Sequence, residues 1–334
     1  MKKAIKVMVF LAVFVICANY IYDVLLWKNS TDNNMYNIQH FYELDDNTVD
    51  ALFLGSSHCF CTVNNAILWD DYGISSYNLA TGCQNIGNTF YFFKEALKTQ
   101  KPKVAIIEMY YTSAGGYGSG DIYRNTLGMH LSKNYIDNVK YSLSIDDNDI
   151  QFKDMVFKWP VVHTRYSELT KADFVDPYPD SLGYYSNWVR NGTFTVPQAC
   201  MEKQIGVLSE DKLLYLDKIV QLAKNNNIEL VFFVAPYILT PEEQQTYNAL
   251  EVYAKENNII FYNFNSIYNE IEFDYSQDMW EQAHLNSWGA EKVSDYLGKV
   301  LSENYNFIDR HNDSKYERWQ NASVVWNNEK AMYE

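Results

Sequence analysis

Short apolar segments alternate with segments of helical periodicity along most of this chain. The predicted strands are residues 50–54, 76–79, 103–110, 229–234 and 259–264. The predicted helices are residues 62–69, 85–101 and 209–227, a helix that begins at Thr240, and residues 287–304. Strands without polar alternation, such as VAIIEM and LVFFV, are typical of a parallel sheet that helices cover on both faces. The pattern therefore predicts an α/β fold, a doubly wound parallel sheet of about five strands.

The helix near residue 240 has a specific start signal. Thr240 is a residue type that caps helices, and Pro241 suits the first helical position. Glu243 follows Thr240 by three positions, so that its carboxylate can return a hydrogen bond to the Thr240 amide. We expect a capping box at this helix start.

The regular pattern stops between residues 112 and 200. A connection of this length is too long for a plain loop, so we expect it to fold as a cap inserted beside the strand ends. The α/β domain is predicted to cover residues 49–304, with the cap at residues 112–200. Residues 305–334 are polar and rich in Asn, and they are predicted to be a C-terminal tail without an assigned role.

The first 27 residues predict a signal-anchor helix. Lys2, Lys3 and Lys6 precede an apolar run from Val7 to Ala18, which continues less cleanly to Trp27. Positive charge before an apolar segment keeps that end in the cytoplasm, which predicts a single-pass cell-membrane protein with an extracytoplasmic domain. Cleavage after Ala18 is the alternative. Residues 28–48 are predicted to be a polar connector.

Composition narrows the classes of partner. A formal net charge of −15 argues against nucleic acid, because phosphate binding needs clustered Lys and Arg. Aromatic residues make up 16% of the chain, including 28 Tyr and 8 Trp, and flat rings with polar tips suit sugar surfaces. The four cysteines after the anchor form either two disulfides or four free thiols. No spacing resembles a zinc site, so we expect no metal and no organic cofactor.

The segment LFLGSSH, residues 52–58, ends a predicted strand with two serines and a histidine. A serine on a tight strand-to-helix turn can present its hydroxyl above the sheet, where backbone amides supply positive potential. Ligands in doubly wound sheets bind at this edge. The alternative is that small residues merely permit a turn.

A candidate base lies near the other end of the chain. His284 immediately precedes the predicted helix at residues 287–304, so it can reach the carboxyl end of the first strand. Glu281, three residues earlier, can hold the other imidazole nitrogen, with Asp278 as the fallback carboxylate. The alternatives are a loop histidine that helps to cap the helix and a solvated acidic face.

These residues carry a resemblance to a known superfamily. GSSH at 55–58, YNLATGCQN at 77–85 and EQAHLNSWGA at 281–290 resemble the first, second and fifth blocks of the SGNH/GDSL hydrolases. The chain is most similar to the membrane-anchored branch that includes the D-alanyl-lipoteichoic acid export and alginate-acetylation proteins. Residues 159–174, WPVVHTRYSELTKADF, also resemble that branch. The resemblance implies a flavodoxin-like, SGNH-type sheet.

The resemblance assigns roles to individual residues. Ser57 matches the nucleophile, His284 matches the base, and the amides of Ser57 and Gly82 match the oxyanion hole. Two departures stand out: the carboxylate before the histidine is Glu281 instead of Asp, and no G-x-N-D block follows the third strand.

The missing side-chain donor of the third block is expected to be replaced by Gln84 or Asn85. Within the cap, His163 and Arg165 are expected to bind substrate, because a polar pair among apolar residues needs a reason. The alternative for this pair is a satisfied buried hydrogen-bonded structure.

The function implied is that of an extracytoplasmic serine esterase or O-acyltransferase. It would act on acetyl or similarly small acyl esters of a cell-surface polysaccharide, through an acyl-serine intermediate. A membrane-bound acyltransferase is an implied partner. The alternative is a non-catalytic, membrane-anchored protein that binds or assembles glycan with the same cleft.

Overall fold

A computed structural model describes residues 2–26, 35–145, 148–175 and 180–334 of the chain. Residues 27–34 of the predicted anchor and connector, and residues 146–147 and 176–179 of the predicted cap, lie outside the described residues.

One parallel sheet forms the centre of the molecule. Its strands are β1 (Ala51–Leu54), β2 (Ser76–Asn78), β3 (Val104–Glu108), β4 (Glu229–Val234) and β5 (Ile260–Asn263). They lie in the order β2-β1-β3-β4-β5 and all pairs are parallel. This is the flavodoxin-like order, in which the chain reverses direction between β1 and β3. The predicted doubly wound α/β fold is confirmed.

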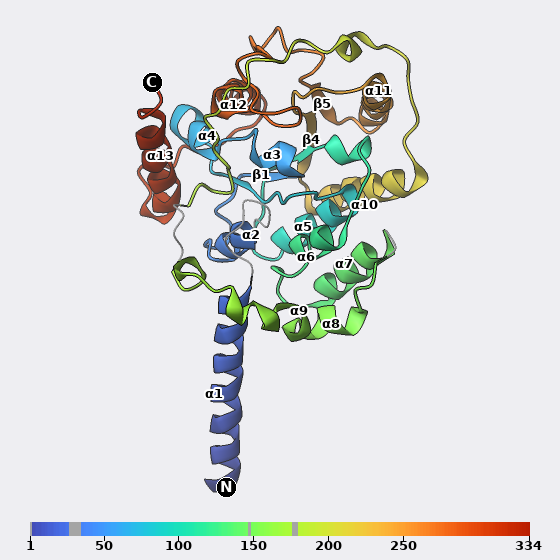
Figure 1. The fold of residues 1–334 in the computed structure, drawn as a ribbon. Coiled ribbons are helices and arrows are strands. Elements are labelled where there is room, and N and C mark those ends of the chain that lie inside the picture. Colours follow the sequence, from blue (N-terminus) through green and yellow to red (C-terminus); the bar gives the residue numbers. More distant parts are fainter. Residues whose placement is uncertain (1, 27–34, 146–147, 176–179) are drawn as a thin grey trace.

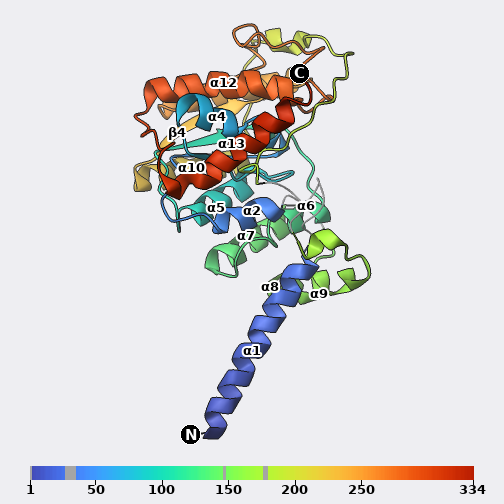
Figure 2. The same cartoon turned by 90° about the vertical axis from the view of Figure 1, so that its left-hand side faces the viewer.

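Helices cover both faces of the sheet (Figure 1, Figure 2). On one side α4 (Asn65–Tyr72) packs against α12 (Ser287–Asn304) and α13 (Glu317–Lys330), and on the other α5 (Ile86–Ala96) packs against α10 (Glu210–Asn226) and α7 (Lys133–Ser144). The helix α11 (Pro241–Glu256) lies against β5. Connections between parallel strands are right-handed, so the face on which a connecting helix lies depends on the side to which the next strand is added. From the switch between β1 and β3 the strands are added in opposite directions, so the helices of the two halves lie on opposite faces of the sheet.

The capping box at residue 240 is confirmed. The side chain of Thr240 accepts a hydrogen bond from the amide of Glu243, and the Glu243 carboxylate accepts one from the Thr240 amide at 2.7 Å. Pro241 takes the first helical position of α11, as predicted.

Two helices lie in segments that were expected to have no regular structure. α2 (Met35–Tyr42) lies in the predicted connector, where the side-chain amide of Asn37 donates to the carbonyls of Asn78 (2.6 Å) and Ala80 (3.0 Å). α13 lies in the predicted tail, and the indole of its buried Trp319 donates to the carbonyl of Ser76 at 2.8 Å. Both helices therefore hold the β2 edge of the sheet.

The insertion at residues 112–200 folds as a series of helices, most of them short. These are η1 (Tyr110–Thr112), α6 (Ser119–Arg124), α7, α8 (Phe152–Phe157), α9 (Trp159–Val162), η2 (His163–Ser167), η3 (Lys171–Asp173) and η4 (Gln198–Met201). α7 packs on α5, whereas α9 and η2 pack against α1 (Lys2–Leu25). Of the described residues of the insertion, Arg124 on α6 and Tyr185 line the cavity at the carboxyl end of β1.

The helix α1 projects from the rest of the molecule (Figure 1, Figure 2). Among the described residues it is the one helix that is long and apolar enough to cross a membrane. The mean hydropathy of its most apolar 18 residues is 2.3. Such a helix fits either a membrane anchor or a signal sequence.

Candidate active site

Ser57 lies on a tight turn at the carboxyl end of β1. The turn begins at Gly55, whose φ of +148° is rarely adopted by residues with side chains. A Cβ on Gly55 would lie only 2.6 Å from the Cβ of Glu108 on the neighbouring strand. The chain then enters α3 (Ser57–Phe60), so Ser57 is its first helical residue. The site is therefore at the switch between β1 and β3, where doubly wound sheets bind ligands.

The two adjacent serines have different partners. Ser56 is fully buried and caps α3: its hydroxyl accepts a hydrogen bond from the His58 amide at 3.2 Å and donates one to Glu108 at 2.7 Å. Ser57 is only partly buried, and its hydroxyl points toward a histidine instead. Ser56 therefore builds the turn, and Ser57 is the hydroxyl that the turn presents.

His284 lies beside Ser57, as predicted. Its Nε2 lies 2.7 Å from the Ser57 hydroxyl oxygen, across 227 positions of sequence. Its Nδ1 is hydrogen-bonded to Glu281, and the hydrogen bond with His284 holds the pKa of that carboxyl below its ordinary value. This chain of hydroxyl, imidazole and carboxylate is the arrangement that activates a serine nucleophile.

Asp278, the fallback carboxylate, does not take part in this arrangement. It is buried, and its carboxylate accepts hydrogen bonds from Lys292 at 2.7 Å and from the Asp274 amide at 2.7 Å. It also lies against the start of α12, where a Cβ on Gly289 would meet its backbone oxygen at 2.4 Å. Asp278 therefore shapes the loop that carries His284.

Two backbone amides are available as oxyanion donors. Within the described part of the chain, no hydrogen bond engages the amide N–H of Ser57 or of Gly82. Both residues line one cavity together with His284. Donors of this kind stabilise the negative charge that develops on a carbonyl oxygen during acyl transfer.

Gln84 and Asn85 are not placed to replace the missing third-block donor. The side-chain amide of Gln84 donates to the Leu79 carbonyl (3.3 Å) and to the Thr81 hydroxyl (3.1 Å), and its oxygen accepts from the Gly55 amide (3.1 Å). Asn85 is the N-cap of α5. Neither residue lines the cavity at Ser57, so the expectation for both is corrected.

The cavity at Ser57 has a volume of about 270 Å³. The residues that line it are Ser57, Phe60, Cys61, Gly82, Cys83, Arg124, Tyr185, Trp280 and His284. This volume is just below the roughly 300–1,000 Å³ of sites for drug-sized ligands, so it suits a small group or one end of a longer molecule.

Arg124 is the residue of the site that sequence reasoning missed. Its side chain covers Gly82, since a Cβ on that glycine would meet the Arg124 Cδ at 2.9 Å and Nη1 at 3.1 Å. Its Nη1 donates to Asp121 at 2.7 Å, whereas its Nε has no hydrogen-bond partner in the described residues. Arg124 belongs to the insertion and lies in no motif, so only the packing of α6 places its charge here.

Glu108 and His58 are two further buried ionisable groups beside the site. Burial raises the pKa of Glu108 to about 7, although hydrogen bonds from Ser56 oppose that shift. Burial also lowers the pKa of His58, and the nearby His284 adds to this. The His58 ring stacks on Tyr110 with centroids 3.8 Å apart, and it lies 5.0 Å from the His284 ring. Burial therefore disfavours a charged His58 ring beside His284.

His163 and Arg165 do not line this cavity. His163 is exposed, and its Nδ1 lies 3.0 Å from the Pro160 carbonyl. Arg165 is buried and donates to the carbonyls of Leu25 and Leu26 and to Asp173. The expectation of a substrate-binding pair is corrected, and Arg165 follows the alternative of a satisfied buried group.

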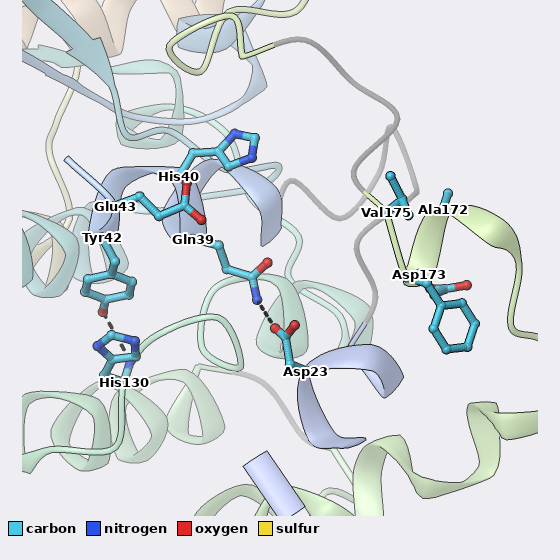
Figure 3. Close-up of a pocket in the computed structure, with 10 residues that line it drawn as sticks. Asp23, Gln39, His40, Tyr42, Glu43, His130, Ala172, Asp173 and Val175 are labelled. Atoms are coloured by element: carbon cyan, nitrogen blue, oxygen red, sulfur yellow. Dashed lines mark hydrogen bonds between the residues drawn. The ribbon is translucent and has the colours of Figure 1, made fainter. Parts of the chain in front are cut away.

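A second cavity, of about 370 Å³, lies near the end of α1 (Figure 3). Figure 3 shows two of its pairs: Gln39 donates to Asp23 at 3.0 Å, and the Tyr42 hydroxyl accepts from the His130 amide at 3.1 Å. Among the described residues, its lining contains no serine or cysteine, so it offers no candidate nucleophile of these two types.

The other chemical expectations concern cysteines and metals. All five cysteines are free: Cys17 is exposed, Cys83 is partly buried, and Cys59, Cys61 and Cys200 are buried. Of the two alternatives, the structure has free thiols. Within the described residues, no group of three or more His, Cys, Asp or Glu is placed to hold a metal ion.

Comparisons with known proteins give only remote similarities. No family profile matches the chain, and no curated protein matches it. A solved structure from Bacteroides fragilis, named as a candidate acylhydrolase, is 13% identical with a TM-score of 0.41, covering 83% of this chain and 99% of that chain. A GDSL-like lipase from Bacteroides thetaiotaomicron has the same identity and TM-score, covering 83% and 100%.

A third solved structure is a candidate lipolytic protein of the G-D-S-L family from Desulfitobacterium hafniense. It is 14% identical with a TM-score of 0.39, covering 76% of this chain and 100% of that chain. Similarity at this level does not identify a family or an activity for the chain.

Proposed function

We propose that the protein is a serine esterase or O-acyltransferase of SGNH type. The observation that carries this proposal is the hydrogen-bonded chain from Ser57 through His284 to Glu281. A serine hydroxyl is a weak nucleophile at neutral pH, and an imidazole within hydrogen-bond reach removes its proton during attack.

The first half-reaction follows from these contacts. The Ser57 oxygen attacks an ester carbonyl carbon while His284 Nε2 takes the hydroxyl proton. Glu281 stabilises the imidazolium that forms, and the amides of Ser57 and Gly82 bind the oxyanion. When the tetrahedral intermediate collapses, the bond to the alcohol oxygen breaks, His284 donates its proton to that oxygen, and the acyl group stays on Ser57.

Arg124 supplies the third donor in this proposal. Its guanidinium covers Gly82 and lines the same cavity, and its Nε is buried without a partner in the described residues. A cationic donor in a partly enclosed site interacts more strongly with an oxyanion than a neutral amide does. This would compensate for the absent third-block asparagine.

The second half-reaction determines whether the protein is a hydrolase or a transferase. Water, activated by His284, would release the acid, whereas a sugar hydroxyl in the same position would receive the acyl group. Tyr185 and Trp280 line the cavity with ring centroids 6.1 Å apart, and they offer apolar surface near a bound acceptor. The small cavity favours acetyl or a similarly small acyl group.

The setting that we propose is the outer side of a cell membrane, with α1 as a single-pass anchor. A cell-surface polysaccharide is the proposed acceptor or substrate, and a membrane-bound acyltransferase is the proposed donor partner. The hydropathy of α1, the lysines in its first turns and the resemblance of the sequence blocks support this setting.

A series of 4-nitrophenyl esters tests the proposed activity. The full chain in detergent should hydrolyse the acetate faster than the butyrate or octanoate, because the cavity accepts only a short chain. Addition of an unacetylated glycan, followed by mass spectrometry, separates transfer from hydrolysis. A folded protein that turns over none of these esters would favour the alternative of a non-catalytic glycan-binding protein.

A further inference from the structure

The helix α1 enters the body of the protein without a break. Its side chains up to Ile21 are exposed except for the half-buried Ala18, and Leu25 and the following Leu26 are buried in the core. Figures 1 and 2 show it leaving the body as one straight helix. The described part of α1 therefore reaches the body as rigid helix.

A buried arginine fixes the end of α1 to the insertion. Nη1 of Arg165 donates to the carbonyl of Leu25 at 2.9 Å and to that of Leu26 at 2.7 Å, and Nη2 donates to Asp173 at 2.8 Å. Carbonyls at a helix C-terminus lack partners within the helix and carry partial negative charge, so a guanidinium stabilises them. This contact sets the direction of α1 relative to η2 and η3.

Helix length places the membrane edge at this junction. The 24 residues of α1 span about 36 Å at ~1.5 Å per residue, and a hydrocarbon core of ~30 Å takes about 20 of them. With Lys2 and Lys3 at one interface, the other edge falls near Tyr22. The ring of Trp159, on α9, lies 6.4 Å from the Tyr22 ring. Trp159 is therefore at the level of the bilayer surface.

The segment that contains Trp159 carries further exposed apolar side chains. Between residues 157 and 175, four more large apolar residues are exposed: Phe157 (72%), Tyr166 (73%), Phe174 (58%) and Val175 (59%). We call these four and Trp159 the collar. Of the elements in this part of the chain, α9 and η2 pack against α1, and α8 packs against α9 (Figure 1).

We propose that the collar inserts into the interface of the lipid bilayer, so that the body rests directly on the membrane. Aromatic residues are enriched at this depth, and apolar surface gains free energy there when it leaves water. The inference rests on the proposed anchoring by α1 and is independent of the proposed catalysis. A rigid junction holds the Ser57 site at one height above the lipid, within reach of a membrane-bound donor.

Lipid contact can be measured residue by residue in the full chain. Tyr166→Cys, Phe157→Cys and, as a matched control, Val207→Cys would each be labelled with bimane in a background without Cys17 and Cys83. Val207 is 85% exposed and precedes α10, away from α1. Each labelled protein is reconstituted into phosphatidylcholine vesicles with or without brominated acyl chains. In a further sample the natural Cys17 is the only labelled cysteine, and its label reports whether α1 lies in the bilayer.

The collar proposal predicts that bromolipid quenches the labels at positions 17, 157 and 166 but not at position 207. Quenching of the label at Cys17 alone would contradict insertion of the collar and would still support α1 as a membrane anchor. Loss of quenching at Cys17 as well would overturn both. Burial of positions 157 and 166 in native membranes, without quenching in pure lipid vesicles, would also overturn the proposal, because a protein would then cover the collar.

Discussion

The carboxylate of Glu108 supports the turn that presents Ser57: it accepts hydrogen bonds from the Ser56 hydroxyl at 2.7 Å and from the Ser56 amide at 3.2 Å. The turn that presents Ser57 therefore rests on a buried acid of the neighbouring strand. Because burial raises the pKa of Glu108 to about 7, this support changes its charge near neutral pH.

We predict that Glu108 makes the stability of the protein depend on pH. The pKa of Glu108 in the folded state, about 7, lies above its ordinary value of 4.5. Between these two pKa values the folded state holds a proton that the unfolded state has lost, so the stability that Glu108 contributes is fully present below about pH 4.5 and is lost as pH rises to about 7. This loss is at most about 3.5 kcal/mol, since the two pKa values differ by about 2.5 units and each unit corresponds to ~1.4 kcal/mol.

Glu108→Gln removes this ionisation while keeping the shape of the side chain. The free energy of unfolding of the full chain in detergent would be measured with urea between about pH 4.5 and about pH 7. It should fall less with rising pH in the variant than in the wild type. Equal pH dependence in both proteins would contradict the assigned role of Glu108.

Ser56 and Ser57 should respond differently to substitution. Ser56→Ala removes the cap of α3 and one donor to Glu108, so it should lower the free energy of unfolding by about 1–3 kcal/mol. The Ser56→Ala protein keeps the Ser57 hydroxyl, so the folded variant should still turn over 4-nitrophenyl acetate. Thermal unfolding and turnover, measured on the same preparation, separate the two effects. A stable but inactive Ser56→Ala protein would mean that the two serines have been assigned the wrong way round.

The carboxylate that orients His284 can be identified by a pair of variants. Glu281→Gln should lower kcat by about 10²–10⁴-fold, because the imidazolium loses its stabilising charge. We expect the lower end of this range, since the Glu281 side chain is 49% exposed and water replaces part of the interaction.

Asp278→Asn is the matched control for Glu281→Gln. It weakens the contacts of the buried Asp278 with Lys292 and Asp274, so it should reduce stability and leave kcat/KM of the folded protein unchanged. The opposite pattern, with Asp278→Asn inactive and Glu281→Gln active, would contradict the arrangement described here.

Arg124 should act on the transition state more than on substrate binding. Arg124→Gln should lower kcat by about 10²-fold with little change in KM, which is the signature of a lost oxyanion donor. Arg190→Gln is the control: this exposed guanidinium stacks over the Trp288 ring at 3.8 Å and does not line the cavity. A raised KM with unchanged kcat in Arg124→Gln would assign the residue to substrate binding instead.

The sheet and its helices could be predicted because their signals are local. A buried parallel strand needs a short apolar run, and a helix such as α11 carries its own cap at Thr240. The same holds for the positions of Ser57 and His284, since parallel strands place their carboxyl ends at one edge. α13, in the predicted tail, also has a local signal, the helical spacing of Trp319, Ala322, Ser323 and Trp326.

The insertion could not be predicted in the same way. Its helices are short, and contacts distant in sequence hold them, such as that between Arg165 and Leu25, 140 positions apart. The position of Arg124 beside Gly82 was missed for this reason: it depends on where α6 packs, and Arg124 lies in no motif. The buried hydrogen bonds of Arg165 were expected only as the alternative to substrate binding. The separate partners of Ser56 and Ser57 likewise required the position of Glu108 on β3.

The reactivity of Ser57 tests the central claim most directly. The full chain in detergent would be treated with a fluorophosphonate probe, and the labelled peptide would be identified by mass spectrometry. The account predicts labelling at Ser57 in the wild type, no labelling in Ser57→Ala, and strongly reduced labelling in His284→Gln. A folded wild-type protein that stays unlabelled, or a Ser57→Ala variant that labels as well as the wild type, would contradict it.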